Sequence, residues 1–333
     1  MAAIQPGRIV YPLILFTALA ARVASPAGAA AQPWRPEAGI ATSRQMKIGG
    51  GTVQVDFANG PTLDLPNDAI LKHIQMAASA VIAYYGRFPV ARARILVVPV
   101  EGGGHREAIQ GTTWGGVDGY QGFTRLRIAQ HATAADLKDD WVTTHELVHM
   151  AFPSMPDDQH WIEEGQATYI EPPARVMTGE LKAESVWSDM VHGMGQGEPR
   201  SGDEGIDHTH TWARTYWGGA LFCFVADVEI RHETGNRKGL QDALRAVNAA
   251  GGTIEHDWPL DRALAIGDRA TGTHVLTEMY AKWKDTPVKV DLPKLWSDLG
   301  IHSTADGGIE ILPNAPLAKI RDAIVGQATQ SPH

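Results

Sequence analysis

Two histidines and a glutamate lie within the five-residue segment His145-Glu146-Leu147-Val148-His149. On a helix, residues i and i+4 share one face, so both imidazoles can reach one cation. Neutral imidazole nitrogens, in a site with three protein ligands, suit a catalytic Zn²⁺ ion. Glu146 would lie beside the metal, where its carboxylate can take a proton from bound water. The segment therefore predicts zinc ligands at His145 and His149 and a general base at Glu146.

A zinc site of this kind needs a third protein ligand, and two adjacent carboxylates follow the first motif. Glu163 and Glu164 lie in the segment 161–167, WIEEGQA. Successive residues on a helix point about 100° apart, so only one of the two can face the metal. Gly165 and Ala167 are small and would allow this segment to approach the first helix closely. The residue types alone leave either glutamate as the ligand and the other as a solvated charge.

Helices must position both motifs. The first helix is predicted to run through the HExxH segment and to end at Pro153, and the second can be capped by Asp157 or Asp158 and is expected to end before Pro172. The first prediction depends on an apolar stripe at helical spacing, formed by Leu137, Trp141, Thr144, Val148 and Phe152.

The chain before residue 133 is predicted to consist mostly of strands. We expect a hairpin over 45–57, a helix over 67–85, a buried strand over 93–100 and a half-exposed edge strand over 119–130. Asn67 or Asp68 can cap the helix, and Gly86 can end it.

After residue 133 the pattern becomes mostly helical, with a polar, glycine-rich loop over 193–209. Strands first and helices later predict an α+β fold rather than alternating βαβ units. We expect an N-terminal lobe with a mixed sheet (32–153), which ends in the HExxH helix, and a C-terminal helical lobe (154–333).

Tyr216 is a candidate for a catalytic role because two glycines follow it in an apolar helix. Gly218 and Gly219 each cost about 1 kcal/mol relative to alanine there, which suggests close contact with another element, such as the zinc helices. A tyrosine just before that contact would lie near the metal; the competing interpretation is a core tyrosine. Three nearby residues could line the same pocket, although the two histidines could equally be solvated: His208, His210 and Arg214.

These motifs together resemble the gluzincin metallopeptidases, most closely the aminopeptidase-type families M1 and M61. HELVH followed by WIEEGQATY is similar to their pattern of HExxH, a spacer and W-x-x-E-G-x-A. The resemblance covers about residues 95–300 and implies a zincin fold with a thermolysin-like catalytic core. It also implies that Glu164, and not Glu163, is the third zinc ligand.

Two further segments resemble the same families. Tyr216-Trp217-Gly218-Gly219-Ala220-Leu221 is similar to their Tyr-x-x-Gly-Ala-Leu helix, which implies that Tyr216 stabilises an oxyanion in the transition state. GGVDG (115–119) loosely resembles their glycine-rich edge-strand motif, in which an acidic residue binds a substrate amine. Asp118 stands there in place of a glutamate, so the resemblance implies a zinc metallopeptidase that is either aminopeptidase-like or an endopeptidase.

The first thirty-one residues have the three-part pattern of a secretory signal peptide. Arg8 precedes the apolar run 9–21, which is too short for a membrane span of about 20 residues, and A-x-A cleavage sites follow at 27–31. The competing interpretation is a disordered or membrane-anchoring terminus. We expect an exported protein, periplasmic or secreted, with no stable membrane insertion after cleavage.

The composition of the chain argues against nucleic acid as a partner. The chain has 333 residues and a formal net charge of −9, which provides no basic face for nucleic acid. Its one cysteine, Cys223, lies in the apolar LFCFV and is interpreted as a small buried hydrophobe. The pattern does not indicate an oligomeric state.

The sequence thus predicts an exported zinc metallopeptidase that acts on a peptide or protein substrate. Two alternatives remain from the sequence: a non-catalytic binding protein of the same fold, and a zinc hydrolase that acts on a non-peptide bond. The intact Glu146 argues against the first alternative, since a retired site has little need of a base.

Overall fold

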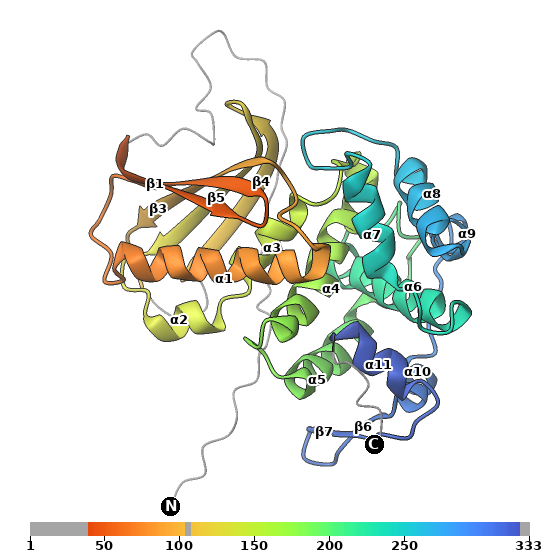
Figure 1. Cartoon of the computed structure of the whole chain (residues 1–333). Helices are drawn as coiled ribbons and strands as arrows, with labels where there is room; N and C mark the ends of the chain where they lie inside the picture. Colours follow the sequence, from red (N-terminus) through yellow and green to blue (C-terminus); the bar gives the residue numbers. More distant parts are fainter. Residues whose placement is uncertain (1–38, 104–107, 327–333) are drawn as a thin grey trace, which may run out of the picture.

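The computed structural model describes residues 39–103 and 108–326, so the signal peptide expected at 1–31 lies outside the described residues. Five strands form a mixed sheet in the order β1-β2-β3-β5-β4 (Figure 1). Their bounds are β1 Ile40–Ile48, β2 Gly51–Ala58, β3 Arg92–Val100, β4 Ile109–Val117 and β5 Tyr120–Ala129. Strands β2, β3 and β5 run parallel, whereas β1 and β4 are antiparallel to their neighbours. The expected mixed sheet at the N-terminal side is confirmed.

Helix α1 (Asn67–Tyr85) connects β2 to the parallel strand β3, and its bounds agree with the prediction. Gly86 ends it in the left-handed conformation, at φ +81°. Neither Asn67 nor Asp68 caps it: the N-cap position is Pro66, without a side-chain hydrogen bond. Alternate residues of the strands, such as Val55, Ile95 and Leu126, join the core that α1 covers.

Strand β5 is not an edge strand, because β4 pairs with it on the side away from β3. The arginines on its outer face suggested an edge, but Arg125 instead covers the ring of Trp114 in β4, with Cζ 5.3 Å from the ring centroid. Strand β4 is the edge, and sequence analysis did not predict it.

Two helices, not one, lead into and through the HExxH segment: α2 (Ala134–Asp139) and α3 (Val142–His149). Asp140 adopts an extended backbone between them, and its carboxylate accepts hydrogen bonds from the backbone N–H groups of Val142 (2.9 Å) and Thr143 (3.1 Å). His73 of α1 lies 2.7 Å from the same carboxylate. Asp140 therefore starts the HExxH helix anew and ties it to α1.

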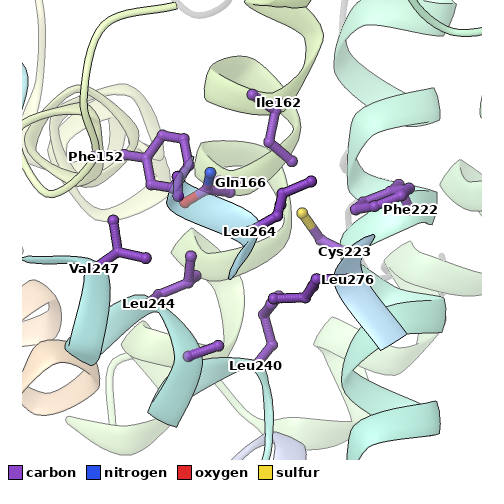
Figure 2. A pocket seen from close by; sticks show the side chains of 12 residues that line it. Phe152, Ile162, Gln166, Phe222, Cys223, Leu240, Leu244, Val247, Leu264 and Leu276 are labelled. Atoms are coloured by element: carbon purple, nitrogen blue, oxygen red, sulfur yellow. The ribbon is translucent and has the colours of Figure 1, made fainter. Parts of the chain in front are cut away.

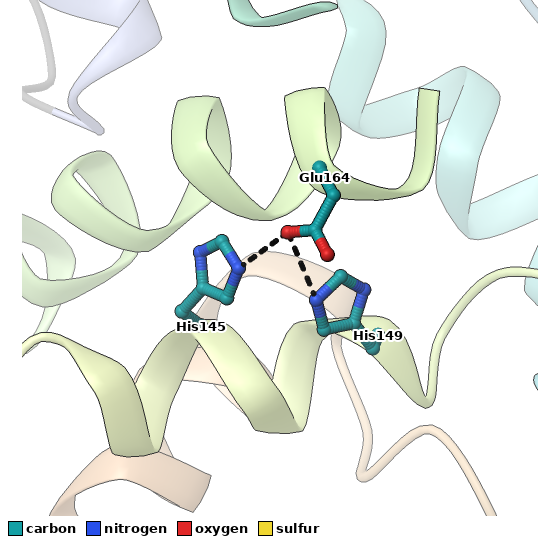
Figure 3. A group of neighbouring side chains, drawn as sticks. All are labelled: His145, His149 and Glu164. Atoms are coloured by element: carbon teal, nitrogen blue, oxygen red, sulfur yellow. Dashed lines mark hydrogen bonds and ion pairs between the residues drawn. The ribbon is translucent and has the colours of Figure 1, made fainter. Parts of the chain in front are cut away.

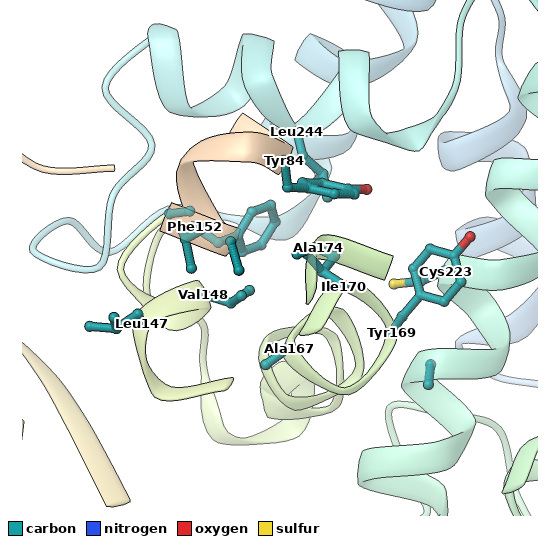
Figure 4. Packing of buried hydrophobic residues seen from close by; sticks show 14 of the residues in the cluster. Tyr84, Leu147, Val148, Phe152, Ala167, Tyr169, Ile170, Ala174, Cys223 and Leu244 are labelled. Carbon is teal, nitrogen blue, oxygen red and sulfur yellow. The ribbon is translucent and has the colours of Figure 1, made fainter. Parts of the chain in front are cut away.

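Helix α4 (His160–Met177) follows a short 3-10 turn at Asp157–Gln159 and contains Pro172 and Pro173, where we expected it to end. Each proline removes a backbone donor, at a cost of about 3 kcal/mol in an isolated helix. The buried side chains of α4, such as Ile170 and Tyr169, pack among α1, α3 and α6, and this tertiary packing outweighs the local cost (Figure 4).

The remaining elements form the helical C-terminal part in Figure 1. Their bounds are α5 Ala183–Gly193, a 3-10 turn Met194–Gly197, a π-helical turn Arg214–Gly218, α6 Gly219–Glu233, α7 Leu240–Ala249, α8 Leu260–Thr271, α9 Val275–Trp283, α10 Leu292–Leu299, β6 Ile301–Ser303, β7 Ile309–Ile311 and α11 Ala318–Ile324. Among the described helices, none has the length and apolar character of a membrane span.

Candidate active site

Helix α3 presents both histidines of the HExxH segment on one side. The ring centroids of His145 and His149 lie 4.9 Å apart. The intervening Leu147 and Val148 are 0% and 2% exposed and anchor the other side of the helix in the core. The i, i+4 spacing therefore produces the predicted pair of converging imidazoles.

Helix α4 brings Glu164 to the two imidazoles. Oε2 of Glu164 lies 3.0 Å from Nε2 of His145 and 3.6 Å from Nε2 of His149 (Figure 3). The ligand atoms of the three residues all lie within 4.8 Å of one another. Two imidazole nitrogens and one carboxylate oxygen at this spacing fit the donor set of a catalytic zinc ion, with a coordination position left for water.

The electrostatics of this trio favour the ionised form of the Glu164 carboxyl. Burial works against the charge on Glu164, but the two imidazoles hold the pKa of its carboxyl well below the usual range. Burial likewise opposes a charge on His149, yet the Glu164 carboxylate raises the pKa of that imidazole to about 9. A metal cation would replace the proton between these groups, so binding would release it.

The approach of α4 to the site depends on glycines at the contact with α6. A Cβ on Gly165 would lie 2.3 Å from the backbone of Gly219, and a Cβ on Gly219 would lie 2.1 Å from the carbonyl oxygen of Trp161. The expected close contact of Gly219 with a zinc helix is thus confirmed. Because neither Gly165 nor Gly219 has a side chain, the backbones of α4 and α6 can touch one residue away from Glu164.

Glu146 lies on the same helix as the two histidines and is held from the edge of the sheet. Thr113 of β4 donates a hydrogen bond to Oε2 of Glu146 at 2.7 Å. A Cβ on Gly111 would lie 2.3 Å from Cγ of Glu146, so only glycine admits the carboxylate so close to the strand. Burial raises the pKa of Glu146, although both imidazoles and Thr113 oppose the shift. A carboxyl with a raised pKa is suited to accept a proton.

Tyr216 faces the site from the π-helical turn, a type of distortion that is frequent at functional sites. Its ring stacks between those of Trp212 (centroids 5.4 Å apart, 22° between planes) and His145 (6.2 Å, 15°). Burial, followed by the carboxylates of Glu164 and Glu146, raises the pKa of its hydroxyl. The hydroxyl therefore stays protonated and available as a hydrogen-bond donor.

The trio, Glu146 and Tyr216 all line one open cleft with a volume of about 420 Å³. Edge strand β4 forms one wall from Ile109 to Trp114. The other residues that line it are Trp141, Val142, His160, Glu163 and Ile254. Among the described residues β4 pairs only with β5, and a cleft with such a strand edge along one wall can accept an extended chain.

Four residues expected near the substrate are not among those that line this cleft. Asp118 (φ +48°) and Gly119 form the two-residue turn of the β4–β5 hairpin, which explains the sequence there. His208 is exposed and lies 2.8 Å from Asp285. His210 is exposed too.

Arg214 is buried and directed toward the loop before the π-helical turn, and it is not among the residues that line the cleft. Its Nε lies 2.8 Å from Asp203 and its Nη1 donates to the carbonyl oxygen of Gly197 at 2.6 Å. These contacts fasten the π-helical turn that carries Tyr216 to the loop before it. Arg214 therefore supports the site from behind and does not line it as we had expected.

Sequence analysis missed Gly111, Thr113 and His160. The first two lie on the unpredicted strand β4, whose run of glycine and threonine hides the usual alternation of apolar residues. His160 lies at the start of α4, 3.2 Å from Oε1 of Glu164. A histidine four residues before a ligand glutamate is a signal that the i, i+4 rule could have found.

A second, much smaller pocket lies between α4, α6, α7 and α8 and is almost entirely apolar (Figure 2). Cys223 and Gln166 contribute its polarisable and polar groups. Burial raises the pKa of the Cys223 thiol, so the thiol is protonated and unreactive, as its apolar surroundings in the sequence predicted. This pocket offers no catalytic chemistry.

Comparison with known proteins shows the fold only. No protein-family model matches the chain, and no curated protein matches its sequence. Among solved structures, the aminopeptidase N family protein of Idiomarina loihiensis superimposes with a TM-score of 0.55 at 12% identity, over 78% of this chain and 49% of that one. An M1 zinc metallopeptidase from Deinococcus radiodurans gives a TM-score of 0.47 at 16% identity, over 75% and 52%. The chain thus spans about half the length of these structures.

Proposed function

We propose that this chain is an exported zinc-dependent metallopeptidase with a thermolysin-like catalytic centre. One observation carries the proposal: the Nε2 atoms of His145 and His149 and Oε2 of Glu164 converge in an open cleft. Glu146, a buried carboxylate that is no member of the trio, lines the same cleft. The fold that the chain shares with the Idiomarina aminopeptidase N family protein supports a peptide as the substrate.

Each residue has a defined task in this mechanism. His145, His149 and Glu164 would hold a zinc ion, which would supply a Lewis acid for the scissile carbonyl and lower the pKa of water. Glu146, oriented by Thr113, accepts the proton of the attacking water and passes it to the leaving amine. The Tyr216 hydroxyl donates a hydrogen bond to the oxygen that becomes negative, an effect of about 3 kcal/mol in comparable sites.

Metal content and peptide cleavage test the proposal together. We expect one zinc per wild-type chain by elemental analysis, and its loss in His149→Ala, because two protein ligands are too few to hold it. The zinc-loaded wild type should cleave members of a mixed peptide library. Stoichiometric zinc in His149→Ala would overturn the site. Zinc without any cleavage would instead favour a binding protein or a hydrolase of non-peptide bonds.

Export is part of the proposal and is supported by the signal-peptide pattern of residues 1–31. When the full chain is expressed in a bacterium, the protein should be recovered outside the cytoplasm with an N-terminus near residue 32. A matched chain with the apolar run 9–21 shortened should remain in the cytoplasm. Recovery of the uncleaved full chain in the cytoplasm would refute export.

A further inference from the structure

His160 lies between two carboxylates at the start of α4. Its Nδ1 is 3.0 Å from Oε2 of Glu163, and its Nε2 is 3.2 Å from Oε1 of Glu164. The two acids follow at i+3 and i+4, so one imidazole reaches both on the same side of the helix. The ring is thereby fixed at both nitrogens, although its side chain is 53% exposed to solvent.

The contact divides the two oxygens of Glu164 between two tasks. Oε2 faces the Nε2 atoms of His145 and His149, and these three atoms would bind the metal. Oε1 faces His160 on the other side. A carboxylate held at one oxygen cannot rotate about its terminal bond without losing that contact. It therefore presents the other oxygen to the cation in one orientation.

A histidine in the first turn of a helix is stabilised by a neighbouring carboxylate such as that of Glu163. The first turn of a helix is the positive end of its dipole, where a donor group such as an imidazolium is disfavoured and carboxylates are favoured. Glu163 has a side chain that is only 13% exposed and points toward His160. Its carboxylate offsets the dipole and orients the ring toward Glu164.

We propose that His160 is a positioning residue that sets the orientation of the zinc ligand Glu164, and that Glu163 in turn holds His160. This inference rests on the zinc site of the proposed function. Groups that hydrogen-bond to metal ligands commonly change metal affinity by 10–100-fold when they are removed. Glu163, the other candidate for the third zinc ligand, thus acts on Glu164 indirectly, through His160.

The test is the zinc dissociation constant, measured by competition with a chromophoric chelator, for the full chain. We expect His160→Ala to weaken zinc binding by about 10–100-fold. His160→Gln keeps one N–H donor on a long side chain and should recover part of the loss. Glu163→Gln should weaken binding less than His160→Ala, because it acts only through the ring.

His131→Ala is the matched control. His131 is also an exposed histidine paired with a carboxylate, 3.0 Å from Asp64 with its side chain 58% exposed, but it lies outside the cleft. It should leave the zinc affinity unchanged. The visible spectrum of the Co²⁺-loaded protein gives a second readout: His160→Ala should shift the ligand-field bands, whereas His131→Ala should not.

The outcomes separate the two proposals. If wild-type protein binds no zinc, the proposed function fails. If wild-type protein binds zinc and the dissociation constants of His160→Ala and His160→Gln equal that of His131→Ala, the positioning role is wrong and the proposed function stands. Thermal unfolding of the metal-free variants identifies any loss of fold, and His160→Gln then decides, since it preserves the size and polarity of the side chain.

Discussion

Two adjacent glycines, Gly218 and Gly219, should differ in how strongly the same substitution destabilises the protein. Both have right-handed helical backbone, at φ −67° and −65°, so alanine is compatible with either backbone. The neighbours differ. A Cβ at Gly219 would meet the carbonyl oxygen of Trp161 at 2.1 Å and Cα of Gly165 at 2.7 Å, both of them backbone atoms. A Cβ at Gly218 would meet Nη1 of Arg214 at 3.1 Å, the end of a side chain.

The magnitude follows from these contacts. Ordinary contact needs about 3.5 Å, so Gly219→Ala must separate α4 from α6 by about 1 Å. Overpacking costs about 1–3 kcal/mol, and a gain of about 1 kcal/mol in helix propensity offsets part of it. Backbone atoms cannot rotate away from the new methyl group, so the cost lies at the upper end of that range, and we expect a net loss of about 2 kcal/mol in the free energy of unfolding. Gly218→Ala gains the same propensity, and its Cβ would meet Nη1 and Cδ of Arg214 and the carbonyl oxygen of Gly197 at 3.1–3.4 Å, which needs shifts of only a few tenths of an ångström, so we expect it to stay within about 1 kcal/mol of wild type.

Thermal unfolding of the metal-free proteins, followed by circular dichroism, measures the difference. One kcal/mol corresponds to about 2–4 °C in domains of 150–250 residues, so Gly219→Ala should melt several degrees below Gly218→Ala. Because Glu164 adjoins the contact at Gly165, Gly219→Ala should also weaken zinc binding. Equal melting temperatures and equal zinc affinities for the two variants would refute the inference that this backbone contact sets the position of Glu164.

Three further predictions concern two groups of the cleft, Thr113 and Tyr216, and the carboxylate of Asp140 at the start of the HExxH helix. Thr113→Val should retain zinc and lower kcat, because it removes the hydrogen bond that orients Glu146; an unchanged kcat would show that Thr113 has no such role. Tyr216→Phe should also retain zinc and lower kcat more than it raises KM, since the hydroxyl acts on the transition state; a change in KM alone would contradict this. Asp140→Asn should lower the melting temperature at pH 7. Burial disfavours the charge on Asp140, but His73 lowers the pKa of its carboxyl below 3.8. The stability that this charge contributes is therefore present above pH 3.8 and is lost as the pH falls through the lower, folded-state pKa. A difference from wild type that persists undiminished at pH 2 would refute the role of the charge.

The sequence was most accurate for those features that short stretches of the chain determine. Helix α1 has the predicted bounds because a periodic apolar pattern and Gly86 act locally. The break at Asp140 escaped prediction because the apolar stripe continues across it, while the carboxylate that ends one helix and starts the next is fixed by His73, 67 residues away. The prolines of α4 were misread for the same reason: the contacts that tolerate them come from other helices.

The candidate site shows the same division. His145, Glu146 and His149 share one turn of helix, so their spacing alone predicted that they would lie together. The choice of Glu164 over Glu163 came from resemblance, and the structure places Glu164 at the histidines. Thr113 acts from an edge strand with no recognisable period, and its contact with Glu146 spans 33 residues of sequence.

Two of the three carboxylates that line the cleft, those of Glu146 and Glu164, depend on glycines at a close contact. Gly111 lets the edge strand pass within contact of Glu146, and the pair Gly165 and Gly219 lets two helices touch beside Glu164. In each case a Cβ on the glycine would clash, with the Glu146 side chain at Gly111 and with helix backbone at Gly165, so the lack of a side chain sets how closely the elements approach. Glycine in β4 also explains why that strand was invisible in the sequence, since the substitutions that would restore its pattern are those the site excludes. Gly111, which helps to obscure β4 in the sequence, is thus also the residue that lets β4 reach Glu146.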